Sequence, residues 1–123
     1  MGTMSFVLYM EDIDFSRNRT SVGNIHWLVW NIPGTEKGLP EGVPNGPLKN
    51  GAYQTSATGP GIYRAPNGPG RKHHYVFQLL ALDIKLDQIM PGPMPFDTLD
   101  AVMKAAQGHI LARINWVTVF GPN

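Results

Sequence analysis

A mainly β domain with Greek-key connections and one helix near the C-terminus is predicted by three observations. Apolar runs of strand length recur along the chain, and each ends at a polar or turn-forming cluster. The segments between these runs are too long for tight hairpins, which favours strands that return beside earlier ones. One stretch, residues 97–106, has the composition of a helix. A length of 123 residues is typical of a single domain, and we expect residues 1–123 to form one.

Four segments are predicted to be strands. Ser5–Met10 is a short apolar run rich in strand-forming residues, and an acidic cluster ends it. His26–Ile32 is a second buried strand, closed by the turn-forming pair Pro33-Gly34. His74–Leu82 is a third. His109–Phe120 shows mixed alternation, which favours a closing strand.

The connections differ in length and character. Glu11–Gly23 is polar and is predicted to be a loop. Thr35–Gly70 is rich in Gly, Pro and Asn and has no convincing periodicity. A loop of this length in a compact domain is disordered or functional, and the rings of Tyr53 and Tyr63 favour an ordered, functional loop. The secondary structure of Asp83–Met90 stays ambiguous, because its apolar residues favour neither a strand nor a helix.

The predicted helix has recognisable ends. Asp97 is expected to be its N-cap, Asp100 lies in its first turn, and it continues through Ala106. Gly108 is well placed to end it. The three tryptophans are expected in the core: Trp27, Trp30 and Trp116.

Charge and composition exclude several classes of function. The net charge is +1 and the charges are scattered, so the chain lacks the basic stripe of a nucleic-acid-binding protein. There is no Cys, and no apolar run approaches the ~20 residues of a membrane-spanning helix. Acidic residues follow the first apolar run too soon for a signal peptide, so a cytoplasmic location is expected as written. A processed or truncated form of a periplasmic or secreted protein would look the same. The densest basic patch suits a single phosphate-sized anion, and it comprises Arg64, Arg71, Lys72, His73 and His74.

Polar side chains stand where buried strands meet loops. Asp12 and Asp14 follow the first strand, His26 opens the second, and His73, His74 and Tyr75 open the third. Neighbouring strands would bring these ends together around one pocket. Imidazole and phenol groups are hydrogen-bond donors to an anionic oxygen, and the carboxylate would attract an ammonium group beside it. The pattern predicts a site for a phosphate or a phosphorylated ligand.

Each of these residues has a plainer interpretation. A buried His is more often hydrogen-bonded structure than ligand. Asp12 and Asp14 could organise an Asx-turn, and Tyr75 could be core. A hydrolase using Asp12 and His26 as a dyad is the alternative function, although no Gly-x-Ser-x-Gly nucleophile motif accompanies them. No metal site or other cofactor is predicted, because no ligand pair has helical metal-site spacing and the adjacent His73 and His74 would face opposite sides of a strand.

The sequence resembles the phosphatidylethanolamine-binding family, in its bacterial Raf-kinase-inhibitor-like branch. The resemblance lies in Met10–Ser16 (MEDIDFS), His26–Pro33 (HWLVWNIP), Leu39–Gly42 (LPEG) and Gly59–Leu82 (GPGIYRAPNGPGRKHHYVFQLLAL). Asp83 and Gln107–Ala112 also fit. The order and spacing of these blocks run nearly the whole length of the chain.

The resemblance implies a β-sandwich-like, Greek-key fold and a non-enzymatic binding protein for phosphate, phosphorylated molecules or lipid head groups, with a protein partner as one possible target. Carried over by position, the pocket residues are Asp12, His26, His73 and Tyr75, and Tyr63 and Pro66 fall in the loop that shapes the pocket. Ile13 and Ser16 stand where the family usually has Pro, and Ala65 stands where it has Gly.

The family usually has further strands before the one that starts here at Ser5. We therefore expect an exposed edge or apolar face around Met4, Phe6 and Leu8, and a homo-oligomer that buries the first strand. The alternative expectation is that the loop Glu36–Thr58 folds over the gap.

Overall fold

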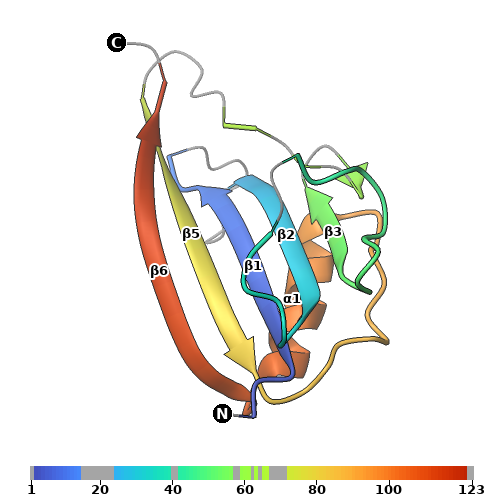
Figure 1. The fold of residues 1–123 in the computed structure, drawn as a ribbon. Helices are drawn as coiled ribbons and strands as arrows, with labels where there is room; N and C mark the ends of the chain where they lie inside the picture. Colours follow the sequence, from blue (N-terminus) through green and yellow to red (C-terminus); the bar gives the residue numbers. More distant parts are fainter. Residues whose placement is uncertain are drawn as a thin grey trace.

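A computed structural model describes residues 2–14, 24–39, 42–56, 59–61, 63, 65–66 and 72–121. Its strands are β1 (Ser5–Asp12), β2 (Asn24–Pro33), β3 (Tyr53–Ser56), β4 (Gly59–Pro60), β5 (His73–Leu82) and β6 (Ile110–Phe120), and its helix is α1 (Pro95–Ala106). All six strands belong to one antiparallel sheet in the order β4-β3-β2-β1-β5-β6 (Figure 1).

The Greek-key connection is confirmed by this order. β1, β2 and β3 are consecutive neighbours, and the chain then returns so that β5 lies on the other side of β1. β1 therefore pairs on both sides, from Ser5 with Pro33 and Leu82 to Asp12 with Asn24 and Tyr75. The free backbone edge that we expected at the first strand is not there. Among the described strands, β4 and β6 lie at the two edges of the sheet, and β6 is the longer of the two.

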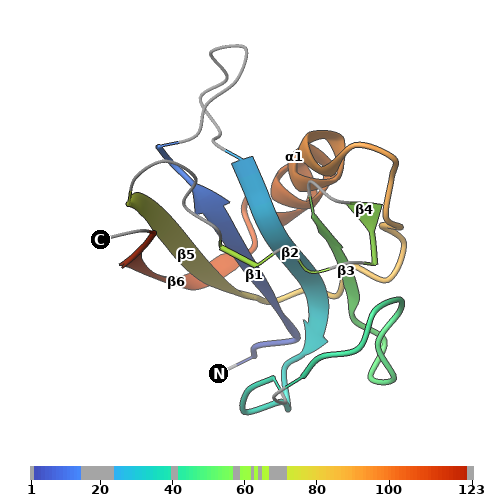
Figure 2. The same ribbon diagram turned by 90° about the horizontal axis from the view of Figure 1, so that it is seen from above.

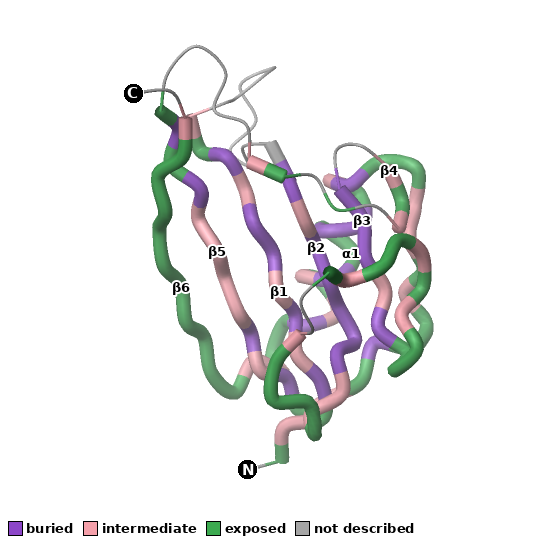
Figure 3. The backbone as a smooth tube through the Cα atoms, turned by 45° about the horizontal axis from the view of Figure 1, so that its top comes forward, coloured by how far each residue is buried: buried purple, intermediate pink, exposed green. Residues whose placement is uncertain are grey.

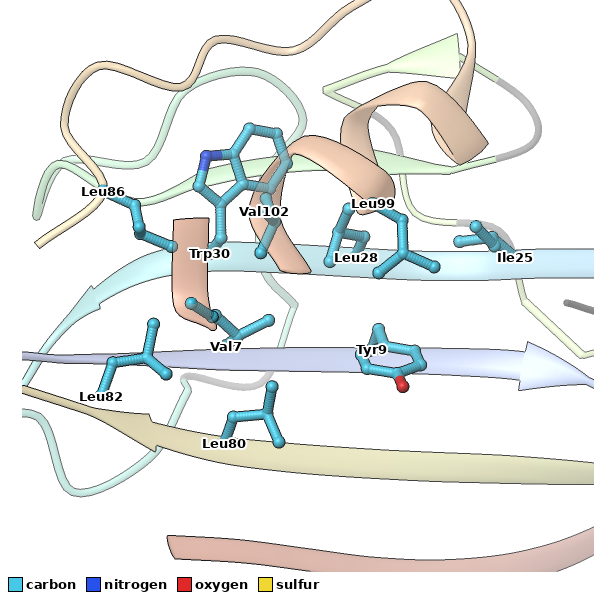
Figure 4. Close-up of a cluster of buried hydrophobic side chains, with 11 residues drawn as sticks. Val7, Tyr9, Ile25, Leu28, Trp30, Leu80, Leu82, Leu86, Leu99 and Val102 are labelled. Atoms are coloured by element: carbon cyan, nitrogen blue, oxygen red, sulfur yellow. The ribbon is translucent and has the colours of Figure 1, made fainter. Parts of the chain in front are cut away.

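One face of the sheet packs against α1 and forms the main core (Figures 2 and 4). Alternate residues of the central strands point to this face, as the period of two in a strand requires, and Val102 and Leu99 of α1 meet them. The buried members include Val7, Leu28 and Leu80. Trp30 is fully buried in this cluster, and its indole Nε1 donates a hydrogen bond to the carbonyl of Ile89 at 2.9 Å.

The helix begins earlier than predicted. Met94 is its N-cap and Pro95 its first residue, so Asp97 lies in the first turn and is not the cap. Pro is favoured at the first helical position because it has no N–H to leave unpaired and its φ is already helical. Asp97 still complements the positive end of the helix dipole.

The described part of the long loop after β2 contains two short strands that the sequence did not predict, β3 and β4. Gln54 of β3 is buried and holds the loop together. Its Nε2 donates to the carbonyls of Pro44 and Gly46, at 2.6 and 3.1 Å, and its Oε1 accepts from Trp27 Nε1 at 2.9 Å. A buried amide with both ends satisfied fixes the loop against β2.

Part of this loop crosses the sheet face opposite α1 (teal in Figure 1). Leu39 and Leu48 pack there, as Phe6 and Leu8 do, against a second buried apolar cluster, which consists of Val29, Ile32 and Ala52. The expected folding of Glu36–Thr58 over this face is thus present in part. An open hollow of about 360 Å³ remains beside residues 36–39, and its apolar lining comes from Phe6, Leu8, Trp27, Ile32, Leu39, Leu79 and Trp116.

One tryptophan is misplaced by the sequence prediction. Trp116 lies on β6 with 42% of its surface exposed, so it is not a core residue. It stacks on Phe77 of β5, with ring centroids 5.2 Å apart and planes at 2°. Figure 3 shows why the prediction failed: β6 is the exposed outer strand of the sheet along nearly all of its length.

Candidate functional site

The predicted site residues from three strands converge on one face of the sheet, opposite α1. Asp12 ends β1, His26 lies near the start of β2, and His73 and Tyr75 open β5. Because β1 lies between β2 and β5, the three strand ends are adjacent. The four side chains are almost completely buried, with exposed fractions between 0% and 4%.

The shortest contact of the cluster joins Asp12 to His73. Asp12 Oδ2 lies 2.5 Å from His73 Nδ1, and both side chains are at most 5% exposed. The other carboxylate oxygen of Asp12 accepts the backbone N–H of Asp14 at 3.0 Å. Asp12 can therefore organise an Asx-turn and also belong to the polar cluster, because Oδ1 accepts the backbone N–H of Asp14 while Oδ2 contacts His73. The pairing also directs the Nε2 side of the His73 ring away from Asp12.

Tyr75 brings the two imidazoles together. Its ring centroid lies 5.1 Å from that of His26 in an edge-on arrangement and 6.4 Å from that of His73 in a stacked one. His26 Nδ1 is 3.1 Å from the carbonyl oxygen of Ala65. Since a carbonyl only accepts, Nδ1 carries the proton and the ring is held in one orientation. The cluster thus has two oriented imidazoles and one phenol on the same face.

The loop residues of the prediction have separate positions. Pro66 is half-buried and follows Ala65, so it adjoins the residue that orients His26. Tyr63 is 41% exposed and packs edge-on against Trp27, with centroids 5.0 Å apart. Partial burial raises the pKa of the Tyr63 hydroxyl. Tyr63 lines a hollow of about 280 Å³ together with Trp27, Gly42, Val43 and Phe77.

The neighbouring histidine points the other way. His74 is exposed, as the alternation of a strand predicts, and its Nδ1 lies 2.7 Å from Asp14 Oδ2. Lys72 is exposed as well. Arg64 and Arg71 of the predicted basic patch lie outside the described residues. The hydrolase alternative paired Asp12 with His26, whereas the structure pairs Asp12 with His73.

Sequence reasoning missed Gln54 and the Ala65 carbonyl, which position Trp27 and His26. Neither had a usable signal, because a polar residue in a Gly- and Pro-rich loop looks solvent-exposed. Within the described residues, no three or more His, Asp and Glu side chains are grouped as a metal site would need. No described helix is both long and apolar enough to cross a bilayer.

The sequence model of the family described as phosphatidylethanolamine-binding protein matches residues 1–121. The chain belongs to the phosphatidylethanolamine-binding protein family. The resemblance stated from the sequence motifs is thereby confirmed, and the mainly β fold with one helix agrees with the solved structures of this family.

Relatives within the family come from distant organisms. A UPF0098 protein of Methanothermobacter thermautotrophicus is 37% identical over 97 residues, which cover 77% of this chain and 61% of that protein. A UPF0098 protein of Aquifex aeolicus is 32% identical over 124 residues, covering 97% of this chain and 67% of that protein. The chain thus spans about three fifths to two thirds of the length of these relatives.

Two crystal structures share the fold. A phosphatidylethanolamine-binding protein homolog from Chlamydia trachomatis superposes with a TM-score of 0.78 at 28% identity, covering 99% of this chain and 74% of that one. Escherichia coli YbcL, described as a member of the mammalian family, gives a TM-score of 0.71 at 23% identity and the same coverage, and it supports the fold alone.

Proposed function

We propose that this chain is a non-enzymatic binding protein whose ligand is a small phosphate-bearing molecule, held at the cluster of Asp12, His26, His73 and Tyr75. The observation that carries the proposal is the 2.5 Å pair between Asp12 and His73 beside two further donor rings on one sheet face. Membership of a family named for a phospholipid supports a ligand with a phosphoryl group. We also propose that the chain belongs to the Raf-kinase-inhibitor-like branch of the family and that it acts on a protein partner.

Each residue has a defined part in this proposal. The Asp12 carboxylate orients His73 through Nδ1, so that Nε2 is directed to the ligand side. The Ala65 carbonyl does the same for His26. Because Nδ1 of each ring is used in this way, the rings donate to phosphate oxygens from Nε2 in their protonated form, and the Tyr75 hydroxyl donates as well. Such charge-assisted bonds are the stronger kind. Pro66 and Tyr63 belong to the loop that shapes the approach.

Burial of the cluster has a free-energy cost that needs an explanation. A polar cluster buried this deeply costs free energy unless each group is hydrogen-bonded, so the fold stabilises it for a structural or a binding reason. The oxygens of a bound phosphate would accept hydrogen bonds from several of these groups at once. A buried site also excludes water, which strengthens each hydrogen bond to a charged ligand.

Isothermal titration calorimetry with inorganic phosphate and with glycerophosphoethanolamine tests the proposal and distinguishes a free phosphate from a lipid head group. Sulfate at equal ionic strength is the control anion. We expect His26→Ala to weaken binding by about 1.5–3 kcal/mol, because a charge-assisted hydrogen bond is removed.

His109→Ala is the matched control. His109 also has an aspartate partner, with Nδ1 2.8 Å from Asp83 Oδ1, but this pair is exposed and lies beyond the other end of β5. If folded His26→Ala and His109→Ala variants lost phosphate affinity equally, the result would contradict the proposed binding site. Release of phosphate from a phosphate ester, abolished by Asp12→Asn, would instead support the hydrolase.

A further inference from the structure

Gln54 of β3 forms a clamp with two glycines of the long loop, Gly46 and Gly61. The Gln54 side chain donates from Nε2 to the carbonyl of Gly46 at 3.1 Å, and the Gln54 backbone carbonyl accepts the N–H of Gly61 at 2.8 Å. The two glycines are also joined directly, because the Gly46 N–H donates to the Gly61 carbonyl at 2.7 Å. We call these three residues the loop clamp, because they tie both sides of the loop to β3.

The loop clamp is too tightly packed to accept a side chain at Gly61. A Cβ at this position would lie 3.0 Å from Gly46 Cα and 3.1 Å from Gly46 N. The φ of Gly61 is +73°, which glycine adopts without strain and other residues rarely adopt. Position 61 therefore requires glycine both for its backbone conformation and for the close approach of the two chain segments.

Two aromatic rings extend the loop clamp toward the polar cluster. The remaining polar atom of the Gln54 side chain, Oε1, accepts a hydrogen bond from Trp27 Nε1 at 2.9 Å. Tyr63 follows Gly61 by two positions and packs edge-on against that indole, with ring centroids 5.0 Å apart. Gly61 and Tyr63 are therefore both held by Gln54, one directly and the other through Trp27.

Ala65 comes two positions after Tyr63 and carries the carbonyl that orients His26. His26 Nδ1 lies 3.1 Å from this oxygen. The register between β1 and β2 shifts between Met10 and Glu11, which makes His26 the extra residue of a β-bulge. Because a bulge interrupts the regular ladder, the orientation of the imidazole depends on where the loop places the Ala65 carbonyl.

We propose that Gln54 is a positioning residue for His26. Through the loop clamp and Trp27 it fixes the place of the Ala65 carbonyl, and this carbonyl holds the proton of the neutral imidazole on Nδ1. The consequence for ligand binding rests on the proposed phosphate site, because a ring held through Nδ1 directs Nε2 to the ligand.

His73 is oriented in a different way and serves as an internal reference. Its Nδ1 lies 2.5 Å from Asp12 Oδ2, which belongs to β1 and not to the loop. Loss of the loop clamp should therefore change His26 and leave His73 as it is, whereas a general loss of structure should change both rings. This difference separates a positioning role of Gln54 from an ordinary contribution to stability.

Gln54→Glu is the main test, because it keeps the shape of the side chain but removes the donor to the carbonyls of Pro44 and Gly46. Long-range proton–nitrogen NMR spectra at about pH 8, where an ordinary imidazole is neutral, report which ring nitrogen carries the proton. We expect His26 to be protonated on Nδ1 in the unsubstituted chain and to be a mixture of both tautomers in the variant, with His73 unchanged. The affinity for inorganic phosphate should fall about fivefold.

Asn50→Asp is the matched control for this substitution. It makes the same change from amide to carboxylate in the same loop, but Asn50 is exposed, and an oxygen that accepts the Ala52 N–H remains. Its amide contact with Glu36 is long, at 3.4 Å, and exposed. We expect Asn50→Asp to leave the tautomer of His26 and the phosphate affinity unchanged.

Gly61→Ala tests the loop clamp without changing Gln54, and it decides the matter if Gln54→Glu does not fold. The added Cβ presses on the backbone of Gly46 and should release the Ala65 carbonyl in the same way. Gly38→Ala is its control, because a Cβ at Gly38 meets nothing within 4 Å. We expect the change at His26 in Gly61→Ala alone.

Circular dichroism establishes that each variant is folded. A folded Gln54→Glu or Gly61→Ala variant in which His26 keeps its proton on Nδ1 would overturn the proposal, and so would equal changes at His26 and His73. If His26 changes selectively but the unsubstituted chain binds no phosphate, Gln54 is a positioning residue and the proposed ligand is wrong.

Discussion

His73 Nδ1 and Asp12 Oδ2 lie 2.5 Å apart although 61 positions separate the two residues in the sequence. The pair exists because β1 and β5 are neighbours in antiparallel register, with Asp12 opposite Tyr75. Two exposed Asp–His contacts, at His74–Asp14 and His109–Asp83, have similar lengths. Burial, and the rings of His26 and Tyr75 beside it, distinguish the Asp12–His73 pair.

Asp12→Asn tests the importance of this pair. The substitution keeps the shape of the side chain but removes the carboxylate, and breaking a buried charge-assisted contact costs about 3 kcal/mol. We expect a lower free energy of unfolding in urea and weaker phosphate binding. Asp83→Asn is the matched control, because the exposed partner of His109 is worth less than about 1 kcal/mol. If Asp12→Asn and Asp83→Asn lowered the free energy of unfolding by similar amounts, burial would not distinguish the Asp12–His73 pair from the exposed one.

Asn31 joins three segments of the chain, and its removal should destabilise the fold. Its Nδ2 donates to the carbonyl of Gly51 at 3.1 Å and to Asp87 Oδ1 at 2.8 Å, and its Oδ1 accepts the N–H of Leu86 at 2.8 Å. Its φ of 59° lies in the left-handed region, which Asn tolerates better than most residues. We expect Asn31→Ala to cost about 2–3 kcal/mol in urea unfolding. The exposed Asn45→Ala should change stability by less than about 0.5 kcal/mol.

Alkaline pH should destabilise the protein through Tyr9. Burial chiefly, and the charge of Glu11 next, raise the pKa of the Tyr9 hydroxyl above its ordinary value of 10.0, while Arg113 and a hydrogen bond with Gln78 oppose the shift. The folded-state pKa thus exceeds the unfolded one. The stability that this shift contributes is fully present below the unfolded pKa and is lost as the pH rises through the folded pKa.

The free energy of unfolding should therefore fall above about pH 10, and Tyr9→Phe should flatten this fall. The measurement is urea unfolding at a series of pH values. Tyr63→Phe is the comparison, since burial also raises the pKa of Tyr63 but 41% of that residue is exposed. If Tyr63→Phe flattens the curve more than Tyr9→Phe does, burial of Tyr9 is not the cause.

The sequence predicted those parts of the fold that apolar periodicity encodes. Apolar runs located β1, β2, β5 and β6 to within two residues at each end. β3 and β4 were missed because they are short and lie in a Gly- and Pro-rich segment. They are strands because β2 offers β3 a partner and Gln54 fixes the loop, and neither fact is local to the sequence.

Trp116 illustrates a different failure. An apolar strand at the edge of a sheet has the same composition as one in its centre, and only the strand order shows that β6 is the outer one. The convergence of Asp12, His26, His73 and Tyr75 was predictable, because polar residues at strand ends stand out. The pairing within this cluster was not, because the choice of His73 over His26 as the partner of Asp12 depends on which strands are neighbours.

The most direct test of the anion site is a phosphate titration followed by the ring NMR signals of the four histidines. We predict that the signals of His26 and His73 shift together and saturate at millimolar phosphate, while the exposed and aspartate-paired His109 stays unchanged at constant ionic strength. Absence of any response at His26 and His73, or an equal response at His109, would contradict the assignment of these buried residues to a phosphate-binding site.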